Sequence, residues 1–208
     1  MAARADLYVS ADVEADGPIA GVYSMLSFGF AVAGAFDGAT FTRLDPESAT
    51  FYRELRPISD QWQPEYLAAS HLDRDRLVRE GAEPAATMTE AARWVVELAG
   101  HHRPVLVAWP LAFDWSFLYW YFERFSAAGS PFGFDSCLDM KTMYQQKADV
   151  VMGLVAKRCM PPRVLPARQH THHGLADAIE QAELFANLFT WRRRPEQRTG
   201  RRRRVGLH

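Results

Sequence analysis

The first third of the chain alternates between hydrophobic and polar residues with the period of two that is typical of β-strands. Residues 7–13 follow this pattern and run into an Asp-Gly-Pro turn, so we expect a strand that ends in a loop. Further strands are predicted over 23–33 and 39–44, joined by a tight connection that makes them antiparallel neighbours. Residues 51–55 are expected either to extend the third strand or to form a short fourth one.

From residue 64 the spacing of the hydrophobic residues changes to about 3.6, which is the period of a helix. Short helices are predicted over 64–70 and 72–80. The segment Thr87-Met88-Thr89-Glu90 fits a capping box, and we therefore expect the next helix over 91–99. The apolar run at 105–109 follows a proline and is typical of a strand that is buried on both faces.

The second half of the chain combines helices with one more short strand. Helices are predicted over 114–125, 141–157 and 173–191, and the short strand around 137–139. This order of elements predicts an α/β fold, a single domain in which a mixed β-sheet is flanked by α-helices. The order is compatible with a ribonuclease-H-like fold, but it does not by itself select a function.

The charge of the chain is unevenly distributed. Residues 192–208 contain eight Arg and one Glu, a net charge of +7, so the rest of the chain carries −8 against the overall −1. With 208 residues and 48% hydrophobic content, the chain can bury one sizeable core. We expect a folded domain over 1–191 and a disordered basic tail over 192–208, which serves either as a solubilising terminus or to attract nucleic acid.

The cysteines and the first residues bear on the compartment. Cys137 and Cys159 lie far apart and form no Cys-x-x-Cys pair, so neither a disulfide framework nor a zinc ribbon is indicated, and a reducing cytoplasm fits best. Residues 1–10 hold one Arg and a short apolar run, too little for a signal peptide or a membrane span. We therefore expect a cytoplasmic protein that does not contact a membrane.

Three acidic residues stand where two strands are expected to end. Asp12 and Glu14 are two residues apart on the first strand, so their carboxylates point to one face and can share a hard cation. Asp114 follows the buried strand, and strand ends in α/β sheets often carry site residues. Each acid also has an ordinary interpretation, because carboxylates at strand ends are usually just solvated and Asp114 suits a helix N-cap.

A third motif opens the last predicted helix. His172 precedes the helix and Asp177 follows five residues later, a spacing that brings an imidazole and a carboxylate to one opening, as base and as metal ligand. An alternative interpretation is a zinc site formed by His170, His172 and His173 with Cys159. No pair of these residues has the spacing usual in zinc fingers, which disfavours that alternative.

In this order, the three motifs resemble the DEDDh exonucleases, a superfamily that includes ribonuclease T, oligoribonuclease and the proofreading subunit of polymerase III. The resemblance covers residues 7–191 and extends to the Asp139-Met140-Lys141-Thr142 segment, which is similar to the family's Asp-x-x-Thr. Two departures stand out. Ala15-Asp16-Gly17 continues the first motif where the family often has Thr-Thr-Gly, and residues 110–113 contain no Asn before Asp114.

The resemblance implies a metal-dependent 3'-5' exonuclease that hydrolyses single-stranded RNA or DNA and releases nucleoside 5'-monophosphates. It implies two Mg²⁺ or Mn²⁺ ions, which neutralise the anionic phosphodiester and orient a water molecule. The expected ligands are Asp12, Glu14, Asp114 and Asp177. The implied general base is His172, since an imidazole can take up a proton near neutral pH. His173 is one residue too close to the last aspartate of the motif.

Contacts with the substrate are expected from residues beside the first two motifs. Ser24 and Met25 are predicted to abut the terminal base, and Phe113 belongs to an aromatic-rich stretch that can stack on bases. Most aromatic residues of that stretch are expected to fill the core instead. Two other functions remain open from the sequence, a nuclease-fold module that binds nucleic acid without cleaving it and a hydrolase of another fold that uses the same carboxylates.

Overall fold

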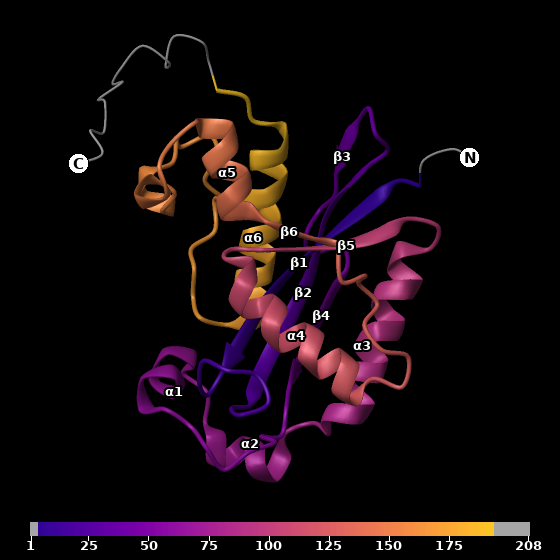
Figure 1. Ribbon diagram of the computed structural model, residues 1–208, viewed down its shortest axis with the longest axis vertical. Coiled ribbons are helices and arrows are strands. Elements are labelled where there is room, and N and C mark those ends of the chain that lie inside the picture. The colour runs from indigo at the N-terminus through magenta and orange to yellow at the C-terminus, as the bar shows by residue number, and fades with distance from the viewer. Residues whose placement is uncertain (1–3, 194–208) are drawn as a thin grey trace, which may run out of the picture.

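The computed structural model describes residues 4–193, in which helices flank both faces of a six-stranded mixed sheet (Figure 1). The strands are β1 Asp6–Ala15, β2 Met25–Phe36, β3 Phe41–Arg43, β4 Thr50–Glu54, β5 Arg103–Ala108 and β6 Cys137–Asp139. The helices are α1 Pro64–Ser70, α2 Arg74–Glu80, α3 Pro84–Ala99, α4 Leu111–Phe125, α5 Met140–Ala148 and α6 Gly174–Thr190, with short 3-10 turns at Met152–Leu154 and Lys157–Cys159. The predicted α/β class is confirmed.

The sheet has the order β3-β2-β1-β5-β6. The pairs β1–β2 and β2–β3 are antiparallel, as predicted, whereas β5 lies parallel to β1 and β6 lies parallel to β5. Strand β4 pairs with β2 beyond the end of β3, so the segment predicted at 51–55 belongs to a separate short strand rather than to an extension of the third. The carboxyl ends of β1 and β5 therefore lie side by side, close to the point where α4 begins.

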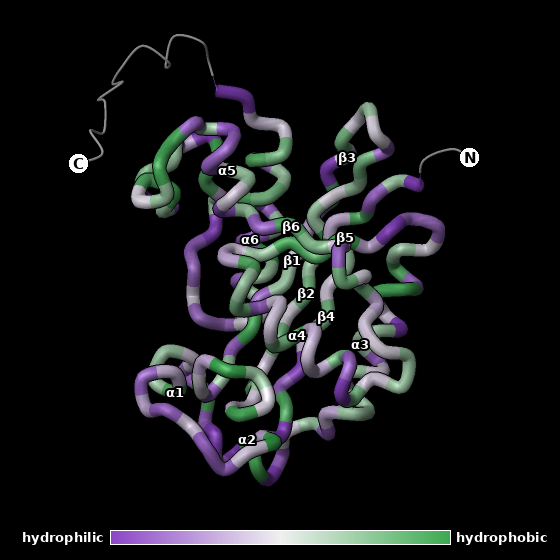
Figure 2. The backbone as a smooth tube through the Cα atoms, in the orientation of Figure 1, coloured by the Kyte–Doolittle hydropathy of each residue, from purple (hydrophilic) through white to green (hydrophobic). Residues whose placement is uncertain are grey.

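Two hydrophobic layers enclose the sheet. On one face, Val9, Ala11 and Val13 of β1 pack in a cluster with α3 and α4. On the other face, Tyr8 packs in a cluster with α5 and α6. Figure 2 shows the hydrophobic stretches of the chain gathered along the central strands. Because side chains alternate along a strand, Asp12 lies on the α6 side of the sheet. It is near the carboxyl end of β1, where acidic side chains follow the hydrophobic ones.

Close backbone packing places the start of α6 against the sheet. Gly29 of β2 pairs with Asp12 of β1, and a Cβ atom at Gly29 would lie 2.5 Å from the carbonyl oxygen of Gly174. Only a residue without a side chain fits at this distance. The first turn of α6, which carries Asp177, consequently lies directly over the end of β1.

A buried ion pair fixes the segment that contains α1 and α2. Asp16, which is fully buried, accepts hydrogen bonds from the Ser24 N–H at 2.6 Å and from Arg74 Nε at 2.9 Å. The carbonyl oxygen of Asp16 accepts the N–H of Gln63 at 2.8 Å, one residue before α1 begins. At the position where the sequence departs from the family's Thr-Thr-Gly, Asp16 therefore attaches α1 and α2 to the end of β1.

Three helix boundaries differ from the prediction by three residues or more. The predicted capping box at residues 87–90 is wrong, because α3 begins at Pro84 and the Glu83 carboxylate accepts the N–H of Ala86. Helix α4 begins at Leu111, with Pro110 at the N-cap, so the alternative role of Asp114 as a cap is also excluded. Helix α5 ends at Ala148 rather than near residue 157. At the start of α3, the cap formed by Glu83 outweighs the local preference of residues 87–90.

Among residues 4–193, no helix is both long enough and apolar enough to cross a membrane. Of the basic tail predicted over 192–208, residues 194–208 lie outside the described part of the chain. Both described tail residues contact the folded body. Arg192 Nη1 donates to the Phe189 carbonyl at 3.0 Å and Arg193 Nη1 donates to the Ala148 carbonyl at 2.5 Å.

Candidate active site

Three carboxylates from two distant elements converge at the end of β1. Asp12 and Glu14 come from the strand and Asp177 from the first turn of α6, and their carboxylate oxygens lie within 4.8 Å of one another. Asp177 is fully buried and Asp12 is 8% exposed. Carboxylate oxygens at this spacing are a donor set that suits a hard divalent cation such as Mg²⁺ or Mn²⁺. The residues therefore fit the metal centre that the sequence predicts.

Asp114 approaches the same end of β1 from α4, on the opposite side of the strand. Its Oδ1 accepts the N–H of Val13 at 2.9 Å, the residue between the two acids of the first motif. Asp114 is 4% exposed, and it does not belong to the trio of carboxylates that lie within 4.8 Å. Three of the four predicted metal ligands are thus in close contact, and the fourth borders them.

Burial and mutual repulsion raise the pKa values of these acids. Loss of solvent raises the pKa of Glu14 to about 7, helped by the negative charge of Asp177. Burial also raises the pKa of Asp12 well above its usual range, with further contributions from the neighbouring carboxylates. Burial has the same effect on the pKa of Asp114, although the hydrogen bond from Val13 opposes it. A bound cation would relieve this repulsion and stabilise the ionised acids.

Asp177 also organises the loop that precedes its own helix. Its Oδ1 accepts the N–H of Thr171 and its Oδ2 accepts the N–H of His172, both at 2.7 Å. His172 has a φ angle of 58°, so the loop turns sharply at this residue. The His170 Nδ1 atom lies 3.1 Å from Asp177 Oδ2. The predicted ligand and the backbone of the predicted base are therefore linked by a direct hydrogen bond.

The three neighbouring histidines have different surroundings. His170 and His172 both line the pocket above the acids, with ring centroids 4.5 Å apart. His173 is instead the N-cap of α6, where its Nδ1 accepts the Ala176 N–H, and its ring stacks on Tyr52 at 4.7 Å. His170, His172 and Asp177 form a second group with the spacing of metal ligands. Neither His173 nor Cys159 belongs to that group, which contradicts the zinc site considered from the sequence.

A glutamine of α6 contacts the metal-ligand candidates directly. Gln181, which is 1% exposed, donates from Nε2 to Asp12 Oδ1 at 2.6 Å. Its Oε1 accepts the N–H of Trp109 at 2.7 Å, just beyond the end of β5. Gln181 therefore connects three elements, α6, β1 and the turn into α4.

A partly buried ion pair lies beside this glutamine. Lys157 Nζ contacts both oxygens of Glu180, at 2.6 and 2.8 Å, and Glu180 is 2% exposed. The positive charge of Lys157 opposes the increase in the pKa of Asp12. The pair attaches the segment between α5 and α6 to the inner face of α6, on the side where the acids lie.

A cavity of about 330 Å³ opens above the carboxylates. The rings of Phe113 from α4 and Tyr66 from α1 form part of its wall, nearly parallel and with centroids 6.4 Å apart. Its lining residues are Asp12, Val13, Glu14, Ala15, Tyr66, Ala69, Trp109, Pro110, Phe113, Asp114, His170 and His172. The predicted contact residue Phe113 is therefore present at the cavity.

Ser24 and Met25 do not reach this cavity. Both are fully buried, and the Ser24 hydroxyl accepts the backbone N–H of Ile58 at 3.0 Å. The N–H of Met25 donates to the hydroxyl of Tyr121 at 2.8 Å. Their position after the first motif suggested contact with a base, but the turn at Asp16 directs them into the interior.

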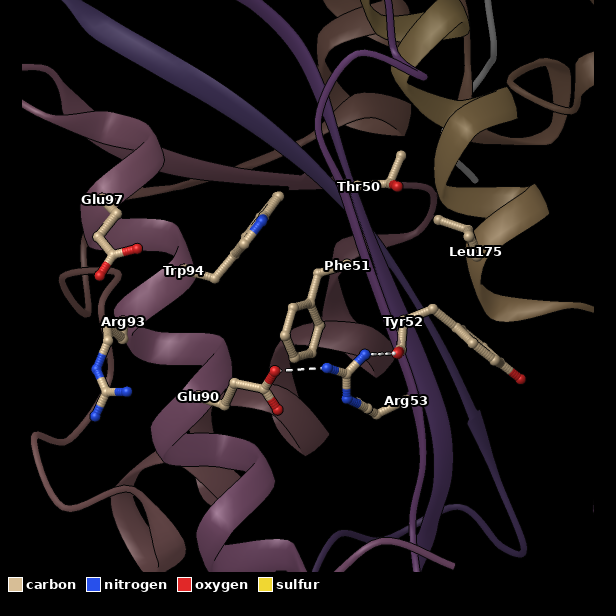
Figure 3. A pocket seen from close by; sticks show the side chains of 9 residues that line it. All are labelled: Thr50, Phe51, Tyr52, Arg53, Glu90, Arg93, Trp94, Glu97 and Leu175. Atoms are coloured by element: carbon tan, nitrogen blue, oxygen red, sulfur yellow. Dashed lines mark hydrogen bonds and ion pairs between the residues drawn. The ribbon is translucent and has the colours of Figure 1, made fainter.

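A larger cavity of about 680 Å³ lies at the edge of the sheet formed by β4, between this strand, α3 and the start of α6 (Figure 3). Its charged residues include an ion pair in which Arg53 Nη2 lies 2.5 Å from Glu90 Oε1. Phe51 and Trp94 point between the strand and the helix, and both also pack into the core. None of the residues around this cavity belongs to a group with metal-ligand spacing, so the smaller cavity is the stronger candidate for catalysis.

Three residues of the site were not singled out by the sequence: Gln181, Tyr66 and Lys157. His170 was considered only as a zinc ligand. One signal was present, because Gln181 lies one helical turn after Asp177 and therefore on the same face of α6. Nothing in the local sequence placed Tyr66 opposite Phe113, since they belong to helices that are separated by α2, α3 and β5.

Comparison with known proteins is consistent with this geometry. No family model matches the sequence. The chain is 33% identical over 181 residues to a 3'-5' DNA exonuclease, Cap18, from Escherichia coli, and the match covers 86% of this chain and 90% of that protein.

Two solved structures share the fold. The nuclease domain of 3'hExo, a DEDDh family member bound to rAMP, has a TM-score of 0.64 at 15% identity, covering 88% of this chain and 92% of that one. Escherichia coli Exonuclease I in complex with a dA16 oligonucleotide has a TM-score of 0.60 at 14% identity. The match covers 92% of this chain, which spans 42% of the length of Exonuclease I. These structures confirm the ribonuclease-H-like fold.

Proposed function

Because the chain belongs to the DEDDh-type 3'-5' exonucleases, we propose that it removes nucleotides from the 3' end of single-stranded DNA and releases nucleoside 5'-monophosphates. The choice of DNA rests on the 33% identical relative, which is named a DNA exonuclease. The choice of a single strand draws on Exonuclease I with its dA16 oligonucleotide. The exonuclease domain would cover residues 1–191, and a cytoplasmic location stays a prediction.

The observation that carries the proposal is the convergence of Asp12, Glu14 and Asp177 on one another, with Asp12 and Glu14 lining a cavity. Burial has raised the pKa values of Asp12 and Glu14, so the group is destabilised when all its members are ionised without a cation. Placing three acids together does not stabilise the fold, because their negative charges repel one another. The arrangement is accounted for by metal binding and phosphodiester hydrolysis.

Each residue of the site takes a role that follows from its position. Asp12, Glu14 and Asp177 would hold divalent metal, Mg²⁺ or Mn²⁺, with Asp114 completing the set at a second ion. When bound, the two ions neutralise the charge of the phosphodiester and make a water molecule nucleophilic near neutral pH. His172, in the loop held by Asp177, would accept the proton of that water at its imidazole.

The terminal nucleotide would enter the cavity between α1 and α4. Phe113 and Tyr66 present nearly parallel rings there, which suits stacking on a base without a preference among bases. Stacking of this kind would orient the 3' end, so that the last phosphodiester lies over the carboxylates. Ser24 and Met25 have no part in this proposal, because they are buried elsewhere.

The experiment is digestion of a 5'-labelled single-stranded DNA with a free 3' hydroxyl, compared with a circular strand and a matched RNA. We expect stepwise shortening of the linear DNA in Mg²⁺ or Mn²⁺, complete loss of cleavage in EDTA and an intact circle. Rapid cutting of the circle would show an endonuclease and contradict the proposal. Faster digestion of RNA would correct the substrate while keeping the reaction.

An alternative is a module that binds nucleic acid without cleaving it. The complete set of acids argues against this alternative, because a binding module has no need for carboxylates that repel its polyanionic partner. In the same experiment, the inactive module would retain labelled DNA in Mg²⁺ without shortening it. Asp114→Asn should behave in that way, because the amide side chain keeps an oxygen acceptor for the N–H of Val13 and removes the charge.

A further inference from the structure

Gln181 lies in the interior between the metal-ligand candidates and the wall of the cavity. It follows Asp177 by four residues on α6, so both side chains project from one face of the helix toward β1. It is 1% exposed, and both ends of its amide are hydrogen bonded, to Asp12 at 2.6 Å and to Trp109 at 2.7 Å. Residues 12, 109 and 181 belong to three different elements of the fold.

The direction of this amide follows from its partners. The N–H of Trp109 can only donate, so the oxygen of the Gln181 amide must face it. The amide NH₂ group must then face Asp12, where it donates to Oδ1. This bond restrains the orientation of the Asp12 carboxylate, which also belongs to the group formed with Glu14 and Asp177.

We propose that Gln181 is a positioning residue, which orients the Asp12 carboxylate for metal binding and couples it to the wall of the cavity through Trp109. This inference rests on the proposed function, because it assigns Asp12 to the metal centre. Gln181 does not touch the substrate in this proposal. Trp109 and Pro110 line the cavity, so the same amide holds both the metal ligand and the turn that shapes the entrance to α4.

A purely structural role would give a different pattern. Loss of a buried hydrogen bond lowers stability wherever it occurs. Metal affinity falls as well only when the lost bond oriented a metal ligand. Loss of such a partner typically lowers metal affinity by about 10- to 100-fold. Metal affinity in the absence of substrate therefore separates the two roles.

The test is Mn²⁺ binding to the metal-free full-length protein, measured by calorimetry for the wild type and for Gln181→Met. Met is similar to Gln in length and fills the same space, but it makes neither hydrogen bond. We expect the dissociation constant to rise by about 10- to 100-fold. Cleavage should be lost at low Mn²⁺ and partly recovered at high Mn²⁺, since the ligands themselves are intact.

Asn187→Leu is the matched control. Asn187 is also on α6, and its amide donates to the carbonyls of Val164 and Leu165 and accepts from Arg43, far along the helix from Asp12. This variant loses a comparable set of hydrogen bonds, so we expect lower stability with unchanged Mn²⁺ affinity. If Gln181→Met does not fold, Gln181→Asn allows the same measurement, because its amide is too short to reach Asp12 and Trp109 together.

Equal Mn²⁺ affinity in the wild type and in a folded Gln181 variant would overturn the inference. A similar loss of affinity in Asn187→Leu would overturn it as well, because the effect would then be general to α6. The proposed function fails separately, if the wild type binds Mn²⁺ but shortens no oligonucleotide. In that case the binding data still decide whether Gln181 orients the Asp12 ligand.

Discussion

A single carboxylate, that of Asp177, connects the metal-ligand candidates to the loop that carries the histidines. Its oxygens accept the backbone N–H groups of Thr171 and His172 while lying close to Asp12 and Glu14. Hydrogen bonds from N–H donors to a carboxylate are strong when the acceptor is charged. Asp177 therefore links the backbone of His172 directly to the group of acids.

The histidines provide a prediction at this scale. His172→Asn should lower the cleavage rate by about 10²- to 10⁴-fold, the usual contribution of a general base. Asn is chosen because it tolerates the positive φ angle of His172. The measurement is single-turnover cleavage at saturating Mg²⁺.

His173→Ala is the control for the histidine prediction. It removes the N-cap of α6 and should lower stability by about 1 kcal/mol while keeping most of the cleavage rate. His170→Asn completes the comparison, since His170 also lines the cavity. Near-full turnover in His172→Asn together with inactivity in His170→Asn would show that the base had been assigned to the wrong histidine.

A second prediction concerns pH. The pKa of Glu14 is about 7 in the folded protein, above its ordinary value of 4.5, so the folded state binds more protons than the unfolded state between these values. The stabilising contribution is fully present below the unfolded pKa and is lost as pH rises through the folded pKa. The pKa values of Asp12 and Asp114 are raised in the same direction. We therefore expect the metal-free protein to lose stability from about pH 5 to pH 8.

Urea unfolding in EDTA at several pH values is the measurement, with Glu14→Gln as the control. The variant should show a smaller loss of stability over this range, because it cannot ionise at this position. Added Mg²⁺ should restore stability at the higher pH, since a ligand that binds the folded state stabilises it. A wild-type stability that increases with pH in EDTA would contradict the assignment of the raised pKa values.

At the scale of elements, the site depends on how closely α6 approaches the sheet. Asp12 and Glu14 are set by β1, but Asp177 and Gln181 reach them only because α6 begins against β2 at Gly29. The strand and the helix are far apart in the sequence. Their contact is made between backbones, so small residues control it.

Gly29→Ala tests this dependence. The added methyl group would meet the backbone of Gly174 and Leu175, which cannot give way without moving the helix. We expect a loss of about 1–3 kcal/mol of stability, typical of overpacking, together with weaker Mn²⁺ binding as Asp177 is displaced. Gly153→Ala is the control, because a methyl group there meets nothing within 4 Å. Unchanged Mn²⁺ affinity in a folded Gly29→Ala protein would show that the approach of α6 does not set the site.

At the scale of the whole molecule, the distribution of charge opposes binding of nucleic acid to the folded body. Residues 1–191 carry −8, while 192–208 carry +7. A polyanionic substrate is repelled by the first charge and attracted by the second. Divalent cations at the carboxylates would reduce this repulsion, and the basic tail would oppose it.

Removal of residues 194–208 tests the tail and keeps the hydrogen bonds of Arg192 and Arg193. We expect weaker binding of single-stranded DNA and a flatter salt dependence, with the slope of log K against log salt falling by about 0.7 for each phosphate that the tail no longer neutralises. The measurement uses an Asp114→Asn background, so that the substrate persists. Equal slopes with and without these residues would show that the tail contributes nothing to binding.

The local pattern of the sequence was sufficient for the fold class, and most of the candidate site was predicted from this pattern together with the resemblance to the DEDDh exonucleases. The spacing of hydrophobic residues indicates whether a segment is a strand or a helix and which of its faces is buried. This spacing can be read from neighbouring residues alone. The positions of β1, β2 and α6 were accordingly predicted closely. Asp12 and Glu14 were placed together because residues two apart on a strand share a face, and Asp177 was placed with His172 because they lie five residues apart.

Tertiary structure alone decided the contacts between distant segments. The bond between Gln181 and Asp12 joins residues 169 positions apart, and no local period reports such a contact. The same reason applies to the burial of Ser24 and Met25, which follows from the turn at Asp16 and its ion pair with Arg74. Sequence periodicity records which face of an element is buried, whereas the partner that covers this face is selected by packing of the whole chain.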